Sequence, residues 1–143
     1  MSVLTLDKAN AIITAAFTKA TELKLKPLAV SVLDAGGHLK AFQKQDGASI
    51  LRFEIASGKA FGALAVGAGS RWLNNQAKER PHFLEGLSNV SGGKIVPVPG
   101  GVLIKNDINE IIGAVGISGD TSDNDEIAAV AGIESAGFSA DAG

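Results

Sequence analysis

The stretch from Lys94 to Asp120 constrains the fold of this chain more than any other part of its sequence. It contains two aliphatic runs, Val102 to Ile104 and Ile111 to Ile117, separated by the polar segment Asn106 to Glu110. Aliphatic, β-branched runs joined by Asn and Asp residues are typical of antiparallel strands with a turn between them. The stretch is also too rich in glycine for a helix, where each glycine costs roughly 1 kcal/mol. We therefore predict two or three short buried strands here, with the rest of the chain packed around them.

A second pair of strands is predicted nearer the N-terminus. The aliphatic run Leu28 to Leu33 is followed by the turn sequence Asp34 to Gly37, and the segment from His38 to Gln43 can return beside it as a β-hairpin. Before this hairpin, Thr5 can cap a helix whose apolar residues recur at helical spacing. Pro27 then blocks continuation of that helix.

A long helix with an unusually small face is predicted from Ser49 to about Val66. The residues that carry hardly any side-chain bulk are Gly58, Ala60, Gly62, Ala63 and Ala65. Glycine lowers helix stability, so such a face indicates that another element packs very close to it. The partner is either the sheet of the same subunit or a helix across a subunit interface, and the sequence leaves both open.

The remaining segments complete an α+β pattern. Residues 70–90 are polar, irregular or short-helical, and we predict that they act as a lid. Thr121 or Ser122 caps a last helix that stops at Gly137, and the tail from Phe138 is expected to be loose. The order of elements predicts an antiparallel sheet with helices on its faces.

Composition excludes several classes of protein. The chain of 143 residues is expected to form one domain, residues 1–143, and its net charge of -2 provides no basic field for nucleic acid or an anionic membrane. It has no cysteine, which excludes disulfides and thiolate-bound metals. No signal peptide or membrane span is predicted, so a cytoplasmic location is expected. Because 45% of the residues are hydrophobic and mean hydropathy is +0.21, we expect part of the surface to be hidden in a homo-oligomer.

Four side chains are the candidates for ligand binding. His82 lies in the sequence Arg80-Pro81-His82-Phe83, which groups a cation, an imidazole and an aromatic ring on the predicted lid and suits a flat or carboxylate-bearing ligand. A surface loop anchored by Phe83 explains the same residues. His38 follows a turn, where it can simply bond to the turn backbone, and Lys59 on the small-residue helix is a candidate for acid–base work or for an ordinary salt bridge.

No metal site is predicted. The acidic residues Asp120, Asp123, Asp125 and Glu126 lack the glycine and distal glutamate of a calcium-binding loop. Carboxylates in a first helical turn are already explained by the helix dipole and its exposed amides. With only two histidines, one chain cannot build a multi-histidine site.

Several of these segments, taken together, resemble the GlcG/HbpS-like haem-degrading domain family. The resemblance rests on LAVSVLDAGGHLKAF at residues 28–42, Asp46-Gly47-Ala48, Lys59-Ala60, Pro99-Gly100-Gly101-Val102, IGAVGISG at residues 112–119 and Asp125-Glu126. It implies a profilin-like α/β/α sandwich with an antiparallel sheet, assembly into dimers or larger homo-oligomers, and haem binding or slow haem degradation in some members. One departure is the turn Asn106 to Glu110, which has no glycine where relatives have a tight Asp-Gly turn.

Two functions follow as hypotheses. The first is a cytoplasmic haem- or tetrapyrrole-binding protein that uses the cleft between sheet and lid, with His82 or His38 as the iron ligand and Arg80 or Lys59 at the propionates. The second is an accessory enzyme or binding module for a small carboxylate metabolite of a catabolic operon. There Arg80 or Lys59 holds the carboxylate, and His82 or an aspartate moves a proton.

Overall fold

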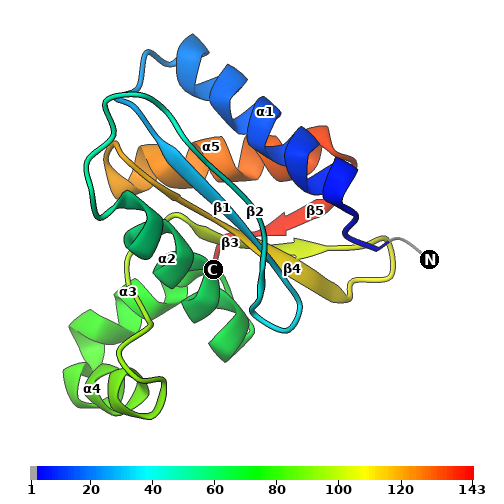
Figure 1. The fold of residues 1–143 in the computed structure, drawn as a ribbon. Helices are drawn as coiled ribbons and strands as arrows, with labels where there is room; N and C mark the ends of the chain where they lie inside the picture. Colours follow the sequence, from blue (N-terminus) through cyan, green and yellow to red (C-terminus); the bar gives the residue numbers. More distant parts are fainter. Residues whose placement is uncertain (1–2) are drawn as a thin grey trace.

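A five-stranded antiparallel sheet forms the centre of the molecule in the computed structural model, which describes residues 3–143 (Figure 1). The strands are β1 (Ala29–Asp34), β2 (Leu39–Lys44), β3 (Gly101–Lys105), β4 (Ile111–Ser118) and β5 (Ser139–Asp141), and their order across the sheet is β2-β1-β4-β3-β5. β4 is therefore the central strand, with β1 on one side and β3 on the other. This confirms the α+β class with an antiparallel sheet, and it confirms that the glycine-rich stretch lies at its centre.

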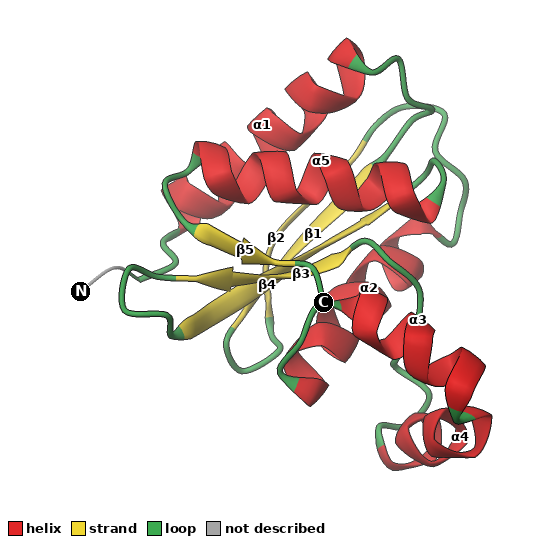
Figure 2. Cartoon of the chain, turned by 180° about the vertical axis from the view of Figure 1, so that it is seen from behind, coloured by secondary structure: helices red, strands yellow, loops and turns green. Residues whose placement is uncertain are grey.

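Two helices cover one face of the sheet, α1 (Leu6–Glu22) and α5 (Ser122–Ser135) (Figures 1 and 2). Their apolar stripes meet the alternate residues of the strands that point the same way, and together they form the main core. Its fully buried members include Ile12, Ile13, Val30, Val115 and Ile133. As predicted, Thr5 caps α1 by accepting a hydrogen bond from the Lys8 amide, and Thr121 caps α5.

The other face of the sheet is covered by α2 (Arg52–Val66), and α3 (Ser70–Glu79) and α4 (Pro81–Val90) lie beyond it (Figures 1 and 2). Helix α2 lies so close to the sheet that a Cβ atom on Gly116 would collide with the Ala56 carbonyl group. Ala60 and Ala63 of the small-residue face pack against the sheet, whereas Gly58 and Gly62 lie against residues 94–96 of the same chain, so most of this face is covered within one subunit. The helix begins three residues after the predicted Ser49, with no side-chain cap.

The turn between β3 and β4 takes the glycine-free form that the sequence predicts. Asn109 adopts a left-handed conformation with φ of 63°, which asparagine tolerates better than most residues. The side-chain oxygen of Asn106 accepts hydrogen bonds from the amides of Ile108 and Glu110. Asn109 thus takes the left-handed position that a glycine usually occupies, and the Asn106 side chain holds the turn through two hydrogen bonds.

The expectation of a loose C-terminal tail was wrong. Residues 139–141 form β5, which pairs with β3 at the edge of the sheet, and Phe138 packs against the main core. The Lys105 ammonium also lies 3.0 Å from the Asp141 carboxylate across this pair. A short polar segment becomes a strand here because β3 presents an unpaired edge to it. None of the helices in the described part of the chain has the length and apolar character needed to cross a membrane.

Candidate functional site

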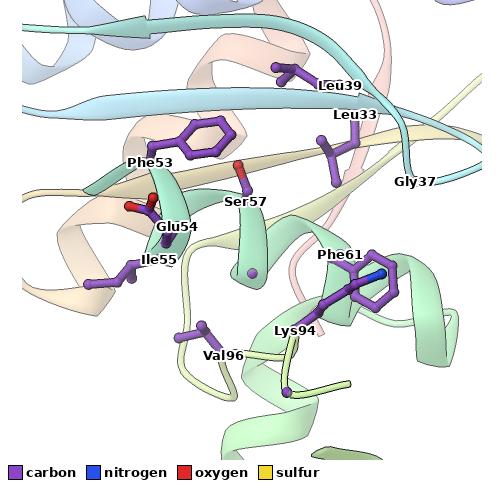
Figure 3. A pocket seen from close by; sticks show the side chains of 12 residues that line it. Leu33, Gly37, Leu39, Phe53, Glu54, Ile55, Ser57, Phe61, Lys94 and Val96 are labelled. Atoms are coloured by element: carbon purple, nitrogen blue, oxygen red, sulfur yellow. The ribbon is translucent and has the colours of Figure 1, made fainter. Parts of the chain in front are cut away.

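A predominantly apolar groove of about 530 Å³ opens between the β1–β2 hairpin, helix α2 and the segment from Gly93 to Val96 (Figure 3). Its apolar walls are Leu33 and Leu39 from the hairpin, Phe53, Ile55 and Phe61 from α2, and Val96. Three of its lining side chains are polar, namely Glu54, Ser57 and Lys94. An apolar depression of this size with a few polar groups is the usual form of a small-molecule site.

The wall formed by residues 93–96 depends on Gly58 in α2. A Cβ atom at that position would lie 2.5 Å from the Val96 Cγ2 atom and 2.8 Å from the Lys94 carbonyl oxygen. The Val96 amide also donates to the Gly58 carbonyl at 3.2 Å. Glycine at this position therefore allows the segment to run directly against α2 and close one side of the groove.

The groove lining carries one cation, Lys94, which lies beside an aromatic ring, and one carboxylate, Glu54. The Lys94 ammonium lies 5.5 Å from the centroid of the Phe61 ring, within the range of a cation–π interaction. Phe53 packs edge to face against Phe42 of β2 at 4.9 Å, which fixes its ring at the hairpin side. The arrangement suits a flat apolar molecule that carries an anionic group.

Lys59, one of the predicted ligand-binding residues, points into the protein interior. Its side chain is 2% exposed, and its ammonium donates to the Ile117 carbonyl at 2.8 Å and to the Asp125 carboxylate at 3.1 Å. Burial lowers the pKa of Lys59 and raises the pKa of Asp125, and the attraction between the two groups opposes both shifts. The pair joins α2 to the start of α5 and leaves this ammonium no access to the groove.

His38 lies at the start of β2 with 83% of its side chain exposed. Its Nδ1 atom is 3.5 Å from the Asp34 carboxylate. That carboxylate accepts hydrogen bonds from the amides of His38 and Gly36, which lower the pKa of Asp34. His38 borders a separate shallow depression beside Glu110, although its neighbour Gly37 belongs to the apolar groove.

Arg80 and His82 lie at the junction of α3 and α4, where the predicted lid is two ten-residue helices. The Arg80 guanidinium stacks 4.3 Å from the centroid of Phe83 and donates to the Gln76 side chain, and His82 is exposed. Neither residue lines the groove. Arg80 and His82 thus lie close together because they are two residues apart in the chain. His38 and Lys59 lie in other parts of the fold.

The acidic residues at the start of α5 are engaged with neighbouring groups. Arg71 of α3 pairs with Asp123 and Glu126, and these contacts raise the pKa of the guanidinium. The Asp120 carboxylate accepts three hydrogen bonds, including one from Asn124, which lower its pKa to about 2. Among residues 3–143 no group of His, Asp and Glu side chains is arranged to hold a metal ion.

Sequence reasoning missed the residues that build the groove. Phe53, Ser57 and Phe61 recur at intervals of four, so they lie on one face of α2, beside the small-residue face. This spacing was the available signal, but it does not distinguish a ligand-binding face from a core-facing one. Lys94 gave no signal, because only the folded chain places it beside Phe61.

The chain is similar over most of its length to a curated protein and to several solved structures. A curated protein of Citrobacter freundii, an uncharacterised 15.0 kDa protein in the dhaT-dhaS intergenic region, is 30% identical over 135 residues, which are 94% of this chain and 92% of that protein. The crystal structure of a PduOC:heme complex is similar with a TM-score of 0.85 and 28% identity, over 96% of this chain and 97% of that chain. Protein ORFY of Klebsiella pneumoniae matches with the same TM-score and identity, over 96% of this chain and 92% of that chain.

The family assignment rests on most of the chain. The family model described as haem degrading protein HbpS-like matches residues 4–134, which include α1 to α4, α5 except its last residue, and the strands β1 to β4. The resemblance seen in the sequence motifs is thereby confirmed, and the chain belongs to the HbpS-like family of haem-degrading proteins.

Proposed function

We propose that this protein binds haem or a related tetrapyrrole in the groove between the β1–β2 hairpin, α2 and residues 93–96. The observation that carries the proposal is the combination of apolar walls with the Lys94 ammonium over Phe61. A porphyrin is a flat apolar ring that carries carboxylates, so it needs this combination. Family membership and the similarity to a PduOC:heme complex support the same ligand.

The groove fits the ring and its carboxylates better than it fits the iron. Its lining offers the Glu54 carboxylate, the Ser57 hydroxyl and the Lys94 amine, but no imidazole. Imidazole is the strongest iron ligand available to this chain, and both His82 and His38 are exposed. We propose His82 as the iron ligand, with Arg80 as a propionate partner and His38 as the competing choice. None of the three lines the groove, so the iron ligand would have to reach the bound ring from outside it.

A haemin titration followed by absorbance tests the proposal. Wild type is expected to give a saturable Soret shift at a defined stoichiometry, which His82→Ala weakens and His38→Ala largely spares. Lys94→Glu is expected to weaken binding about tenfold, because a charge-assisted contact contributes roughly 1.5–3 kcal/mol. Lys78→Glu on α3 is the matched control, since it makes the same charge change on an exposed lysine outside the groove.

The outcomes separate the parts of this proposal. A featureless, unsaturable haemin spectrum with wild type contradicts haem binding. If the Soret shift is lost in His38→Ala and kept in His82→Ala, the iron ligand is His38. Equal effects of Lys94→Glu and Lys78→Glu place the ring outside the groove.

A small-carboxylate metabolite is the second candidate ligand. The same lysine that suits a propionate suits any carboxylate, and Phe61 beside it favours an unsaturated or aromatic carbon skeleton. This function replaces the first if haemin does not bind saturably. A role as an accessory enzyme or binding module of a catabolic operon belongs to this second candidate, and a cytoplasmic location is proposed for either function.

We also propose that the protein assembles into a homo-oligomer. The small-residue face of α2 no longer supports this, because the sheet and residues 94–96 already cover it. The support comes instead from exposed apolar side chains at the start of α2 and on β2, where Ile50 is 90% exposed, Leu51 58% and Leu39 52%. Ile50 and Leu51 are adjacent in the chain, and large apolar side chains exposed side by side mark a surface for association.

A further inference from the structure

A pair of hydroxyl groups lies between β1 and α2 at the edge of the groove. Ser31 of β1 is fully buried, whereas Ser57 of α2 is half-buried and lines the groove (Figure 3). Their Oγ atoms are 2.9 Å apart, so one hydroxyl donates a hydrogen bond to the other. Within residues 3–143 this is the one hydrogen bond that either side-chain oxygen makes.

Burial decides which hydroxyl donates. If Ser57 donated, the hydrogen of the buried Ser31 hydroxyl would have no acceptor, and an unsatisfied buried donor is costly. If Ser31 donates, its hydrogen is satisfied, and the hydrogen of Ser57 is free to turn toward the groove. The second arrangement leaves no buried donor unpaired and equips the groove with a hydrogen-bond donor aimed from its helical wall.

We propose that Ser57 is the specificity-determining donor of the groove, held in that role by Ser31. This inference rests on the proposed function, and it narrows the ligand to a flat apolar molecule that carries an oxygen acceptor as well as an anionic group. Lys94 attracts the anionic group from the 93–96 segment, and Ser57 donates to the acceptor from α2. Two polar contacts from different walls fix the orientation of a ring that apolar contacts alone leave free to rotate.

Three variants separate the binding role of Ser57 from its structural role. Haemin affinity is expected to fall about fivefold in Ser57→Ala, the usual effect of one neutral hydrogen bond, and to change less than twofold in Ser31→Ala. The midpoint of unfolding in urea is expected to depend on whether the two serines are removed singly or together, unlike the haemin affinity, which depends on Ser57. Ser57→Ala lowers the midpoint, since it leaves the Ser31 hydroxyl buried and unpaired, and the double variant Ser31→Ala/Ser57→Ala recovers it without recovering affinity.

Each outcome decides the inference. Equal losses of affinity in Ser31→Ala and Ser57→Ala, or unchanged affinity in Ser57→Ala while wild type binds haemin saturably, overturn it and leave haem binding intact. If wild type does not bind haemin saturably, the proposed function fails and the same variants are titrated with 8-anilinonaphthalene-1-sulfonate, an apolar ring anion with sulfonate acceptors. A fluorescence titration weakened only in the variants lacking Ser57 then supports the donor role, and equal binding by all variants overturns it.

Discussion

At the scale of single residues, the Lys59–Asp125 pair is the one ion pair among residues 3–143 in which both side chains are buried. Both side chains are 2% exposed, and Asp125 also accepts from the Asp120 amide at 3.0 Å. Removing one partner of a buried ion pair leaves an uncompensated charge, whereas replacing both with apolar side chains often costs little. The pair therefore contributes little net stability but makes each partner indispensable to the other.

Lys59→Met is expected to lower the free energy of unfolding by roughly 3–5 kcal/mol at pH 7, and Lys59→Met/Asp125→Leu by much less. Without the lysine, the burial that raises the pKa of Asp125 is opposed mainly by the hydrogen bond from the Asp120 amide, so the folded-state pKa of Asp125 stays above its ordinary value. A carboxyl with a raised pKa holds its proton more tightly in the folded state, so stability is gained as pH falls. The deficit of Lys59→Met should thus shrink between pH 7 and pH 4, as urea unfolding can measure. A pH-independent deficit, or a double variant as unstable as the single one, contradicts this account.

At the scale of elements, α2 determines where the groove lies, because its glycines decide what approaches it. Gly58→Ala is expected to destabilise the protein by roughly 1–3 kcal/mol, since the added methyl group meets Val96 and the Lys94 backbone. Gly86 in α4 is the matched control. A Cβ atom there meets nothing within 4 Å, so Gly86→Ala should stabilise the protein by about 1 kcal/mol through helix propensity. Thermal unfolding measures the stability of both variants. Equal stability changes in Gly58→Ala and Gly86→Ala would show that residues 94–96 move aside for the added methyl group at little cost.

Most elements were predictable because their signals are local. The hairpin, the capped helices α1 and α5, and strands β3 and β4 each carry their own periodicity and turn residues. β5 carries neither, and Ser139-Ala140-Asp141 becomes a strand only because β3 offers it an edge. The groove was unpredictable for the same reason. It combines a hairpin end, one face of α2 and a loop, and only their tertiary arrangement brings Lys94 to Phe61.

At the scale of the whole molecule, the exposed apolar side chains around Ile50 lead us to expect association. Light scattering at micromolar concentration should give a mass above that of the 14.5 kDa chain. Ile50→Lys/Leu51→Lys should reduce this mass, because lysines in the contact would have to be desolvated. Val90→Lys is the control, since Val90 is 85% exposed on α4, away from that surface. A monomer mass for wild type, unchanged by salt, contradicts the expectation.

The late position of the central strand in the chain has a consequence for biosynthesis. β1 pairs on its inner side with β4, whose register joins Ala29 to Ser118, so the middle of the sheet cannot assemble until most of the chain has left the ribosome. Until then the β1–β2 hairpin exposes an unpaired apolar edge, which is a template for aggregation. Contacts so distant in sequence also slow folding. Nascent chains halted before residue 111 should therefore depend on chaperones, whereas chains that extend beyond residue 118 contain all of β4 and can close the middle of the sheet.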